Sequence, residues 1–194
     1  IDDELTRLDE GPDVAPAEPQ TDDSADGVDP STNGHPGVQA ARSTEPAWCE
    51  VRLLGPPEVI RDGKPVEALP PRALEMLLYL VTHPGGVPKE RLDNVMWAGR
   101  SAGGGTQRLT SALTKLRGAL GDGPDGELLV PRRSGDEPIM LSSHVGCDVD
   151  RVLAHLDLAG DLPVDLRARE VAAALELVRG EPFEGKAYSW ATEI

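Results

Sequence analysis

Long apolar runs are missing from this sequence, which has no stretch of 18 consecutive apolar residues. A transmembrane helix needs about 20 such residues, so the sequence predicts none. A basic region followed by an apolar stretch is also missing at the N-terminus, and we expect no signal peptide. The chain starts at Ile1 and ends at Ile194, which we interpret as a piece of a longer, cytoplasmic protein. Contact with a membrane would come only through parts outside this sequence.

Cysteine is scarce as well. Cys49 and Cys147 are not part of a CxxC pair, and no histidine lies beside them at the spacing of metal ligands. Two isolated cysteines do not make a disulfide framework. We interpret both as small, partly buried apolar residues in a reduced intracellular setting.

Recognisable catalytic and cofactor-binding motifs are also missing. The sequence has no Ser-His-Asp or Cys-His arrangement, and its glycine runs at 85–86 and 103–105 lack the following Lys-Ser or Lys-Thr of a phosphate-binding loop. We expect no enzyme activity, no cofactor, no metal and no small-molecule substrate. The scattered histidines, for which we expect no catalytic or metal role, are His35, His83, His144 and His155.

Acidic residues are in excess, and the excess is concentrated at the N-terminus. The chain has a net charge of −15, and residues 1–46 hold twelve acidic against two basic residues, a net of −10. Residues 11–46 are rich in Pro, Asp, Gly and Ser and have no aromatics, so they cannot bury enough apolar surface to offset chain entropy. We expect 1–46 to be a disordered acidic tail or linker. A tail that competes with DNA for a basic surface is a further hypothesis.

Residues 47 onwards begin with the pattern of a β-meander. Short apolar segments at 49–54, 58–61 and 64–69 are separated by Gly-Pro-Pro and by Asp62-Gly63. Asp-Gly between two such segments is a strong hairpin signal. The sequence therefore predicts three antiparallel strands.

Three helices are predicted next. Pro70 and Pro71 open the first, because proline is tolerated in the first turn, and the His-Pro-Gly-Gly segment from residue 83 ends it. Pro88 opens the second. The third runs from about residue 106 to residue 120, and its apolar residues share one face, which predicts the side that packs inward. These residues are Leu109, Leu113, Leu116 and Leu120.

A β-hairpin, or wing, is predicted after the third helix. Apolar residues at 128–130 and 139–141 flank a polar, Gly-containing turn at 131–138. The fold class is therefore α+β. We predict a winged helix-turn-helix domain at 47–147, with an N-terminal antiparallel meander and a C-terminal hairpin wing.

The apolar spacing becomes helical again at 149–158 and at 166–178. We expect residues 148–194 to be part of a helical, TPR-like domain. Asp148 and Asp150 stand at the start of the helical segment at 149–158, and we expect them to cap that helix.

The meander, three helices and hairpin follow the order of the OmpR-type winged helix. The sequence resembles an actinobacterial branch of this family, the antibiotic regulatory proteins, in which a bacterial transcriptional activator domain follows the winged helix. In some relatives this pair ends a long membrane-attached chain that carries a LysM module. The similar segments are "VRLLGPPEV" at 51–59, "RALEMLLYLVTHPGGVPKERL" at 72–92, "MW" at 96–97, "LTKLRGALG" at 113–121, "CDVDRVLAHL" at 147–156 and "ALELVRGEPFEG" at 174–185.

The resemblance implies a regulator that binds double-stranded DNA, with the third helix in the major groove and the wing on the backbone. The transcription machinery or another protein is a further implied partner. Gln107, Ser111 and Thr114 lie opposite the leucine face, and such side chains bond base edges or phosphates. The basic residues expected to neutralise phosphates are Arg100, Arg108, Lys115, Arg132 and Arg133.

Two departures weaken the expected interface. Gly118 stands where relatives often carry a basic residue, and Asp136 and Glu137 in the wing would repel phosphates. Because phosphate contacts supply most non-specific affinity, we expect weak DNA binding unless a dimer or partner contributes. A winged helix used for protein contacts is the alternative function, and an enzyme or enzyme subunit is a third. We expect Arg117 to pair with the helix body or the wing base, and Trp97 to anchor the core.

Overall fold

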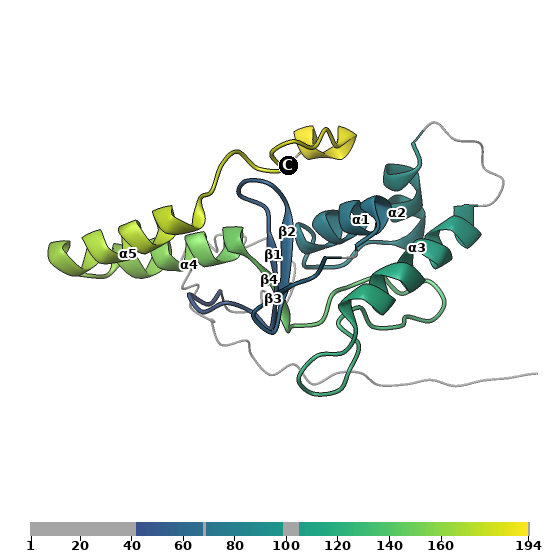
Figure 1. Cartoon of the computed structure of the whole chain (residues 1–194), viewed down its shortest axis with the longest axis horizontal. Helices are drawn as coiled ribbons and strands as arrows, with labels where there is room; N and C mark the ends of the chain where they lie inside the picture. The colour runs from purple at the N-terminus through teal and green to yellow at the C-terminus, as the bar shows by residue number, and fades with distance from the viewer. Residues whose placement is uncertain (1–41, 68, 99–104, 194) are drawn as a thin grey trace, which may run out of the picture. The chain divides into compact units, whose positions relative to one another are not determined.

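The computed structural model describes residues 42–67, 69–98 and 105–193, all of them within one compact unit, 36–194 (Figure 1). Most of the predicted acidic tail lies outside the described residues. Among the residues described, no helix is both long and apolar enough to cross a membrane.

Four short strands form one open sheet in the order β3-β2-β1-β4. β1 (Cys49–Arg52), β2 (Glu58–Arg61) and β3 (Lys64–Pro65) make the predicted antiparallel meander. Asp62 and Gly63 have φ of 49° and 70°, as the central residues of a tight hairpin turn require. β3 is shorter than predicted, although Val66 N, just after it, still donates to Val59 O of β2 (2.9 Å).

The fourth strand was missed by the sequence reasoning. β4 (Val145–Cys147) pairs parallel with β1, with Cys147 opposite Val51. The two buried cysteines therefore lie on neighbouring strands, and burial raises the pKa of the Cys49 thiol to about 11 and that of Cys147 to about 12. Both thiols stay protonated at neutral pH, which agrees with their interpretation as small apolar residues.

The three predicted helices are confirmed as α1 (Pro71–Val81), α2 (Lys89–Met96) and α3 (Gly105–Leu120). They pack around one core with the inner face of β1, and the leucine face of α3 is buried as expected. α1 is buried on most of its surface, because Met76, Tyr79 and Leu80 are buried as well as Leu77, Leu78 and Val81. The largest fully buried side chains include Met76, Leu77, Leu78, Leu80, Leu92, Leu116 and Leu120.

The predicted hairpin wing is wrong in its pairing. Its arms at 128–130 and 139–141, all described, form no strand ladder; the backbone hydrogen bond nearest to such a pairing runs from Ser142 N, just after the second arm, to Leu129 O (2.9 Å). Leu128 instead bridges to Asp122 and Ile139 to Val87. The first arm therefore pairs with the turn that follows α3 and the second with the segment before α2, and residues 131–138 form an irregular loop between the arms.

The two later helices are confirmed as α4 (Asp148–Gly160) and α5 (Val164–Leu177), which pack side by side (Figure 1). Asp148 does not cap α4 as expected. Its buried carboxylate accepts hydrogen bonds from Leu53 N (2.8 Å) and Leu54 N (2.9 Å), beyond the end of β1. On the same side of β1, buried Glu50 pairs with Arg151 of α4 (2.7 Å) and with Arg52 (2.9 Å).

The segment after α5 returns to the winged helix and ends in a short 3-10 helix, η1 (Ser189–Glu193). Phe183 N donates to Leu53 O (2.9 Å), and Gly55 N donates to Glu181 O (3.0 Å). Trp190 then packs edge-on against Tyr79 of α1, with ring centroids 5.2 Å apart, and its indole Nε1 donates to Glu75 (3.4 Å). In a chain with six aromatic residues, four of them share this one cluster, which joins the C-terminal segment to α1.

We predict that Asp148→Asn lowers the free energy of unfolding by about 1–3 kcal/mol, because the amide leaves one buried backbone N–H without an acceptor. Chemical denaturation of the full chain measures this. Asp150→Asn is the matched control: Asp150 is exposed in the same helical turn, and its change costs about 0.3–1 kcal/mol through the helix dipole. Equal losses for the two variants would contradict the structural role given to Asp148.

Candidate nucleic-acid interface

The outer face of α3 carries the residues that sequence reasoning selected. Gln107, Ser111, Thr114 and Lys115 are exposed there, opposite the buried leucines. The hydroxyl of Thr114 donates to Thr110 O of its own helix (2.8 Å), so it faces a ligand as an acceptor. The structure therefore brings four predicted residues onto one accessible surface.

A groove runs along the N-terminal half of this face, with a cavity volume of about 500 Å³. It lies between α3, the start of α1 and the end of α2, and we call it the basic groove. Three of its lining residues are basic and none of the described ones is acidic. The lining residues are Pro70, Arg72, Ala73, Trp97, Gln107, Arg108, Ser111, Ala112 and Lys115.

Arg72 and Trp97 were not selected as site residues from the sequence. The Arg72 guanidinium lies 5.9 Å from the ring centroid of Trp97 and donates to Glu75 (2.6 Å), so it is held from two sides. Trp97 is half-buried and packs against the core as predicted, but it also forms one wall of the groove. The sequence signal was only a basic residue after Pro-Pro; its position beside Trp97 depends on how α1 and α2 pack.

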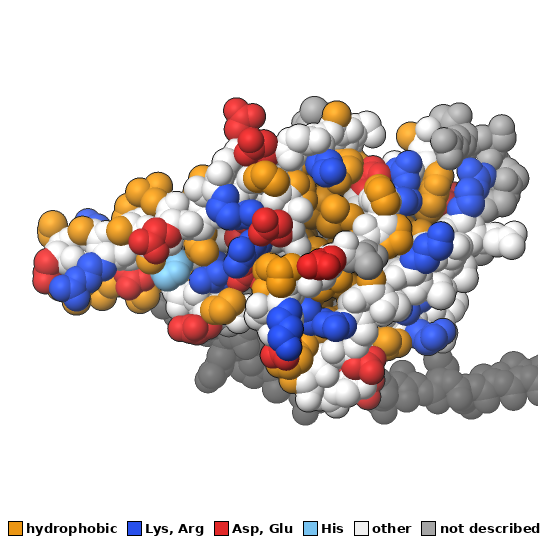
Figure 2. Space-filling view, in the orientation of Figure 1, with side chains coloured by type: hydrophobic (Ala, Val, Ile, Leu, Met, Phe, Trp, Pro, Cys, Tyr) orange, Lys and Arg blue, Asp and Glu red, His pale blue; other side chains and the backbone are white. Residues whose placement is uncertain are grey.

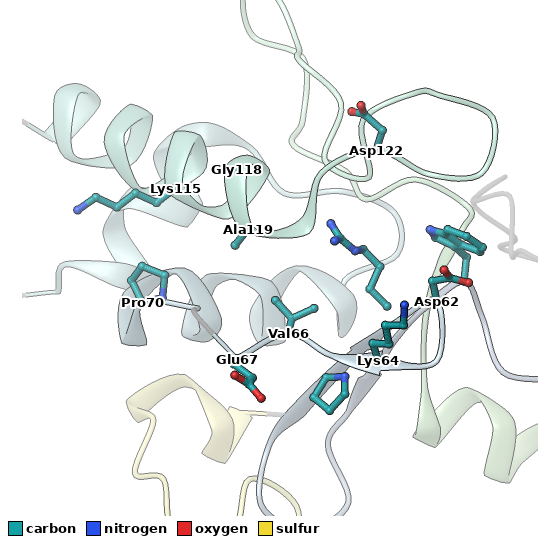
Figure 3. A pocket seen from close by; sticks show the side chains of 12 residues that line it. Asp62, Lys64, Val66, Glu67, Pro70, Lys115, Gly118, Ala119 and Asp122 are labelled. Atoms are coloured by element: carbon teal, nitrogen blue, oxygen red, sulfur yellow. The ribbon is translucent and has the colours of Figure 1, made fainter.

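A second, larger groove of about 920 Å³ continues along the C-terminal half of α3, towards the β2–β3 hairpin (Figure 3). Its charges are mixed: Asp62, Glu67 and Asp122 line it together with Lys64 and Lys115. Arg61 also lines it, but its guanidinium donates to Leu120 O at the end of α3. We call it the mixed groove.

The face of α3 is therefore divided by charge. Lys115 and Pro70 border both grooves, and acidic side chains appear only on the C-terminal side of them. On the visible face of the molecule, Lys and Arg side chains are spread from the α5 end to the helix-turn-helix, with Asp and Glu side chains among them (Figure 2). A polyanion would meet favourable charge at the N-terminal half of α3, which is the end that contacts base edges in helix-turn-helix proteins.

The first residues of the wing loop are held to α3 by hydrogen bonds. Arg117, in the last turn of α3, donates from Nε to Val130 O (2.9 Å) and from Nη2 to Pro131 O (3.2 Å). Burial and the positive charge of nearby Arg132 lower the pKa of Arg117. The expected pairing of Arg117 with the wing base is confirmed.

The middle of the wing loop and its second arm are also held by hydrogen bonds, to residues in and just before α2. Lys89 Nζ donates to Gly135 O, and Val87 and Ile139 exchange two backbone hydrogen bonds of 2.9 and 2.8 Å. Glu137, which was expected to repel phosphates, accepts a hydrogen bond from Ser134 N (3.2 Å) inside the loop. Among the residues that the structure describes, Arg132 and Arg133 are exposed and have no acidic partner.

Comparison with known proteins adds one observation. No protein-family model and no curated protein sequence matches the chain. EmbR from Mycobacterium tuberculosis, solved in complex with a low-affinity phosphopeptide, has a similar structure, with a TM-score of 0.55 and 21% sequence identity. The match covers 71% of this chain and 38% of the EmbR chain, so this chain spans well under half of EmbR's length. The likeness is one of fold, and it supports the OmpR-like fold implied by the sequence.

Two of the predicted site residues, Arg100 and Arg108, are not among the exposed residues that the structure describes. Arg100 lies outside the described residues. Arg108 lines the basic groove but is half-buried rather than fully exposed. Among the described residues of the predicted set, the basic side chains classed as exposed are Lys115 on α3 and Arg132 and Arg133 on the wing.

We predict that Arg117→Met loosens the wing. The variant loses both hydrogen bonds to the carbonyl oxygens of Val130 and Pro131, which costs about 1–3 kcal/mol of stability. Hydrogen exchange should show faster exchange at residues 132–139 than in wild type, while α4 and α5 stay as protected as before. Unchanged exchange in the wing would mean that Lys89 and the Val87–Ile139 bridge hold it without Arg117.

Proposed function

We propose that this chain is the DNA-binding part of a transcriptional regulator, with double-stranded DNA as its ligand. The observation that carries the proposal is the basic groove on the N-terminal half of an exposed helix face, which no described acidic residue lines. Beside it is a wing whose base is held by Arg117 and whose Arg132 and Arg133 are exposed, with no acidic partner among the described residues. An anionic backbone is the ligand that such a surface favours, because neutralising phosphates releases counterions.

The residues divide into two roles. Gln107 and Ser111 reach base edges in the major groove, since amide and hydroxyl groups can both donate and accept there. Lys115 and Arg72 border the basic groove and contact phosphates on one side of the helix. Arg132 and Arg133 contact the backbone from the wing, at a distance from α3 that Arg117 fixes.

We predict that the full chain binds duplex DNA of mixed sequence and that its affinity falls steeply as salt rises. In the variant Arg132→Ala/Arg133→Ala, binding should weaken and the slope of log K against log salt should decrease by about 2, because two phosphate contacts are lost. Fluorescence anisotropy across a salt series measures both quantities.

Arg169→Ala is the control for this experiment. Arg169 is an exposed arginine on α5, far from the wing in the fold, so its loss changes the net charge of the chain without removing a proposed contact. A slope that decreases equally on loss of Arg169 would contradict a DNA contact by the wing. Absence of binding at about 50 mM salt would reject the proposed function itself.

A second candidate function, protein recognition, is favoured by the outer face of α5. Val164, Ala168, Val171, Leu175 and Val178 recur at the alternating spacing of four and three residues that suits packing against another helix. Val164 is 79% exposed and Leu175 65% exposed. The exposed large apolar side chains of the described residues all belong to α4, α5 or the residue after α5.

We predict that Leu175→Lys leaves the melting temperature unchanged, because the Leu175 side chain is mostly exposed to water in the folded chain. We also predict that the variant loses any association of the chain with itself. Sedimentation velocity at rising protein concentration measures this. Glu176→Lys, one position away from the apolar stripe, is the control. Association that survives Leu175→Lys would show that another surface is responsible.

A further inference from the structure

The C-terminal segment, residues 181–193, docks on α1, the helix whose first turn borders the basic groove. Its Trp190 is only 4% exposed. The rings packed against Trp190, with centroids 5.2–5.4 Å from its own, are those of Tyr79, Phe183 and Tyr188. A ring packed on three sides is held in one orientation, so its indole N–H is directed at a fixed place on α1.

Glu75 of α1 is the residue that Trp190 reaches. One oxygen of its carboxylate accepts a hydrogen bond from the indole Nε1 (3.4 Å), and the other accepts one from Arg72 Nη1 (2.6 Å). The Glu75 side chain is 14% exposed, so little water competes with these two partners. Because a carboxylate is planar and rigid, fixing one oxygen limits where the other can lie. The position of Trp190 thus restricts that of Arg72.

Arg72 carries this restriction to the basic groove. It lines the groove, and its guanidinium lies over Trp97, 5.9 Å from the ring centroid. Its side chain is nevertheless 43% exposed. A ligand in the groove therefore meets a guanidinium that is already held by a carboxylate and an aromatic ring. Holding it in this way reduces the conformational entropy that the side chain loses when it binds an anion.

A second observation places the C-terminal segment within electrostatic reach of the same ion pair. Burial and the negative charge of Glu75 raise the pKa of Tyr188, whereas the positive charge of Arg72 lowers it. Tyr188 stacks on Trp190 with an angle of 8° between the ring planes. Two residues of the segment, rather than a single hydrogen bond, therefore face the pair of Glu75 and Arg72.

We propose that Trp190 and Glu75 are positioning residues for the phosphate contact of Arg72, so that docking of the C-terminal segment on α1 strengthens the binding of duplex DNA at the basic groove. The inference rests on the proposed function and adds a means of regulating that site, because the segment after α5 controls a contact made from α1. Since coupling between two binding events is reciprocal, bound DNA also stabilises the docked segment.

The test is a double-mutant cycle in the full chain. Trp190→Phe keeps an aromatic ring in the cluster but removes the N–H that Glu75 accepts, and it should weaken binding to duplex DNA of mixed sequence about two- to threefold. Arg72→Met should decrease the slope of log K against log salt by about 1, because one phosphate contact is lost. When Arg72→Met is already present, Trp190→Phe should have no further effect on affinity, since the residue that it positions is gone. Fluorescence anisotropy across a salt series measures these quantities.

Arg91→Met supplies the matched background. Arg91, on α2, donates to the hydroxyl of Tyr79 (3.2 Å) beside the same aromatic cluster, but it lines neither groove. Trp190→Phe should therefore weaken binding by the same factor in Arg91→Met as in wild type. Glu75→Asp is a second variant, which keeps the charge but is too short to reach both partners. It should weaken binding only while Arg72 is present.

Hydrogen exchange tests the reciprocal effect. In the docked segment, Phe183 N donates to Leu53 O (2.9 Å) and Ala191 N donates to Tyr188 O (3.1 Å). At equal saturation with DNA, the exchange of these two amides should slow more in wild type than in Arg72→Met. A Trp190 that acted only on stability would change the melting temperature without this dependence on Arg72.

Two results would overturn the inference by itself. An equal loss of affinity on Trp190→Phe with and without Arg72 would assign the effect of Trp190 to another residue. Unchanged or tighter binding by Trp190→Phe, at an unaltered melting temperature, would mean that Arg72 binds without help from the C-terminal segment. Failure of wild type to bind DNA would reject the proposed function, and this inference with it, and is distinguished because the failure appears before any residue is changed.

Discussion

The carboxylate of Asp148 is the contact on which the arrangement of the two halves depends. It is buried, and both of its oxygens accept backbone N–H groups just beyond the end of β1. A buried charge is tolerated only when such hydrogen bonds satisfy it, so the first turn of α4 cannot move away from β1 without a large penalty. β1 consequently lies between α1 to α3 and α4 (Figure 1), and the ion pair of Glu50 with Arg151 is a second contact on the α4 side.

The same constraint explains why the C-terminal segment reaches the helix-turn-helix. Once α4 is fixed, the α4–α5 hairpin returns the chain to Leu53 and Gly55, where residues 181–184 continue the backbone hydrogen bonding. Trp190 then contacts Glu75, and Glu75 in turn holds Arg72 at the border of the basic groove. The aromatic cluster and the basic groove are therefore connected through the carboxylate of Glu75, although Trp190 and Glu75 are 115 residues apart in the sequence.

The sequence predicted those parts whose cause is local. The leucine spacing of α3, the Asp62-Gly63 turn and the Pro-initiated helices all come from neighbouring residues, and each was confirmed. β4 could not be predicted, because three residues carry no periodicity and their partner strand lies far back in the chain. Asp148 looked like a helix cap for the same reason: its true partners, Leu53 and Leu54, are 95 and 94 residues away.

For the candidate site, too, the sequence predicted the features with a local cause and missed those that depend on long-range packing. The exposed polar face of α3 follows from the helical period, so Gln107, Ser111 and Lys115 were found. The groove that they border was not, because it needs Arg72 of α1 and Trp97 at the end of α2 to lie beside them. The predicted pairing of the wing arms was wrong because Ile139 pairs with Val87, before α2, and Leu128 pairs with Asp122, in the turn after α3.

The net charge of −15 does not by itself argue against a polyanionic ligand. Charges in water act over about 8–10 Å at physiological salt, so the total charge governs the approach of a ligand and the local charge governs its binding. Two thirds of the excess lies in residues 1–46, whereas residues 72–133 hold nine basic against six acidic residues. Within that stretch, Glu75 is paired with Arg72, and Asp125 with His144. The lining of the basic groove holds three basic residues and, among those described, no acidic one, so an overall acidic chain still offers an anion a favourable place to bind.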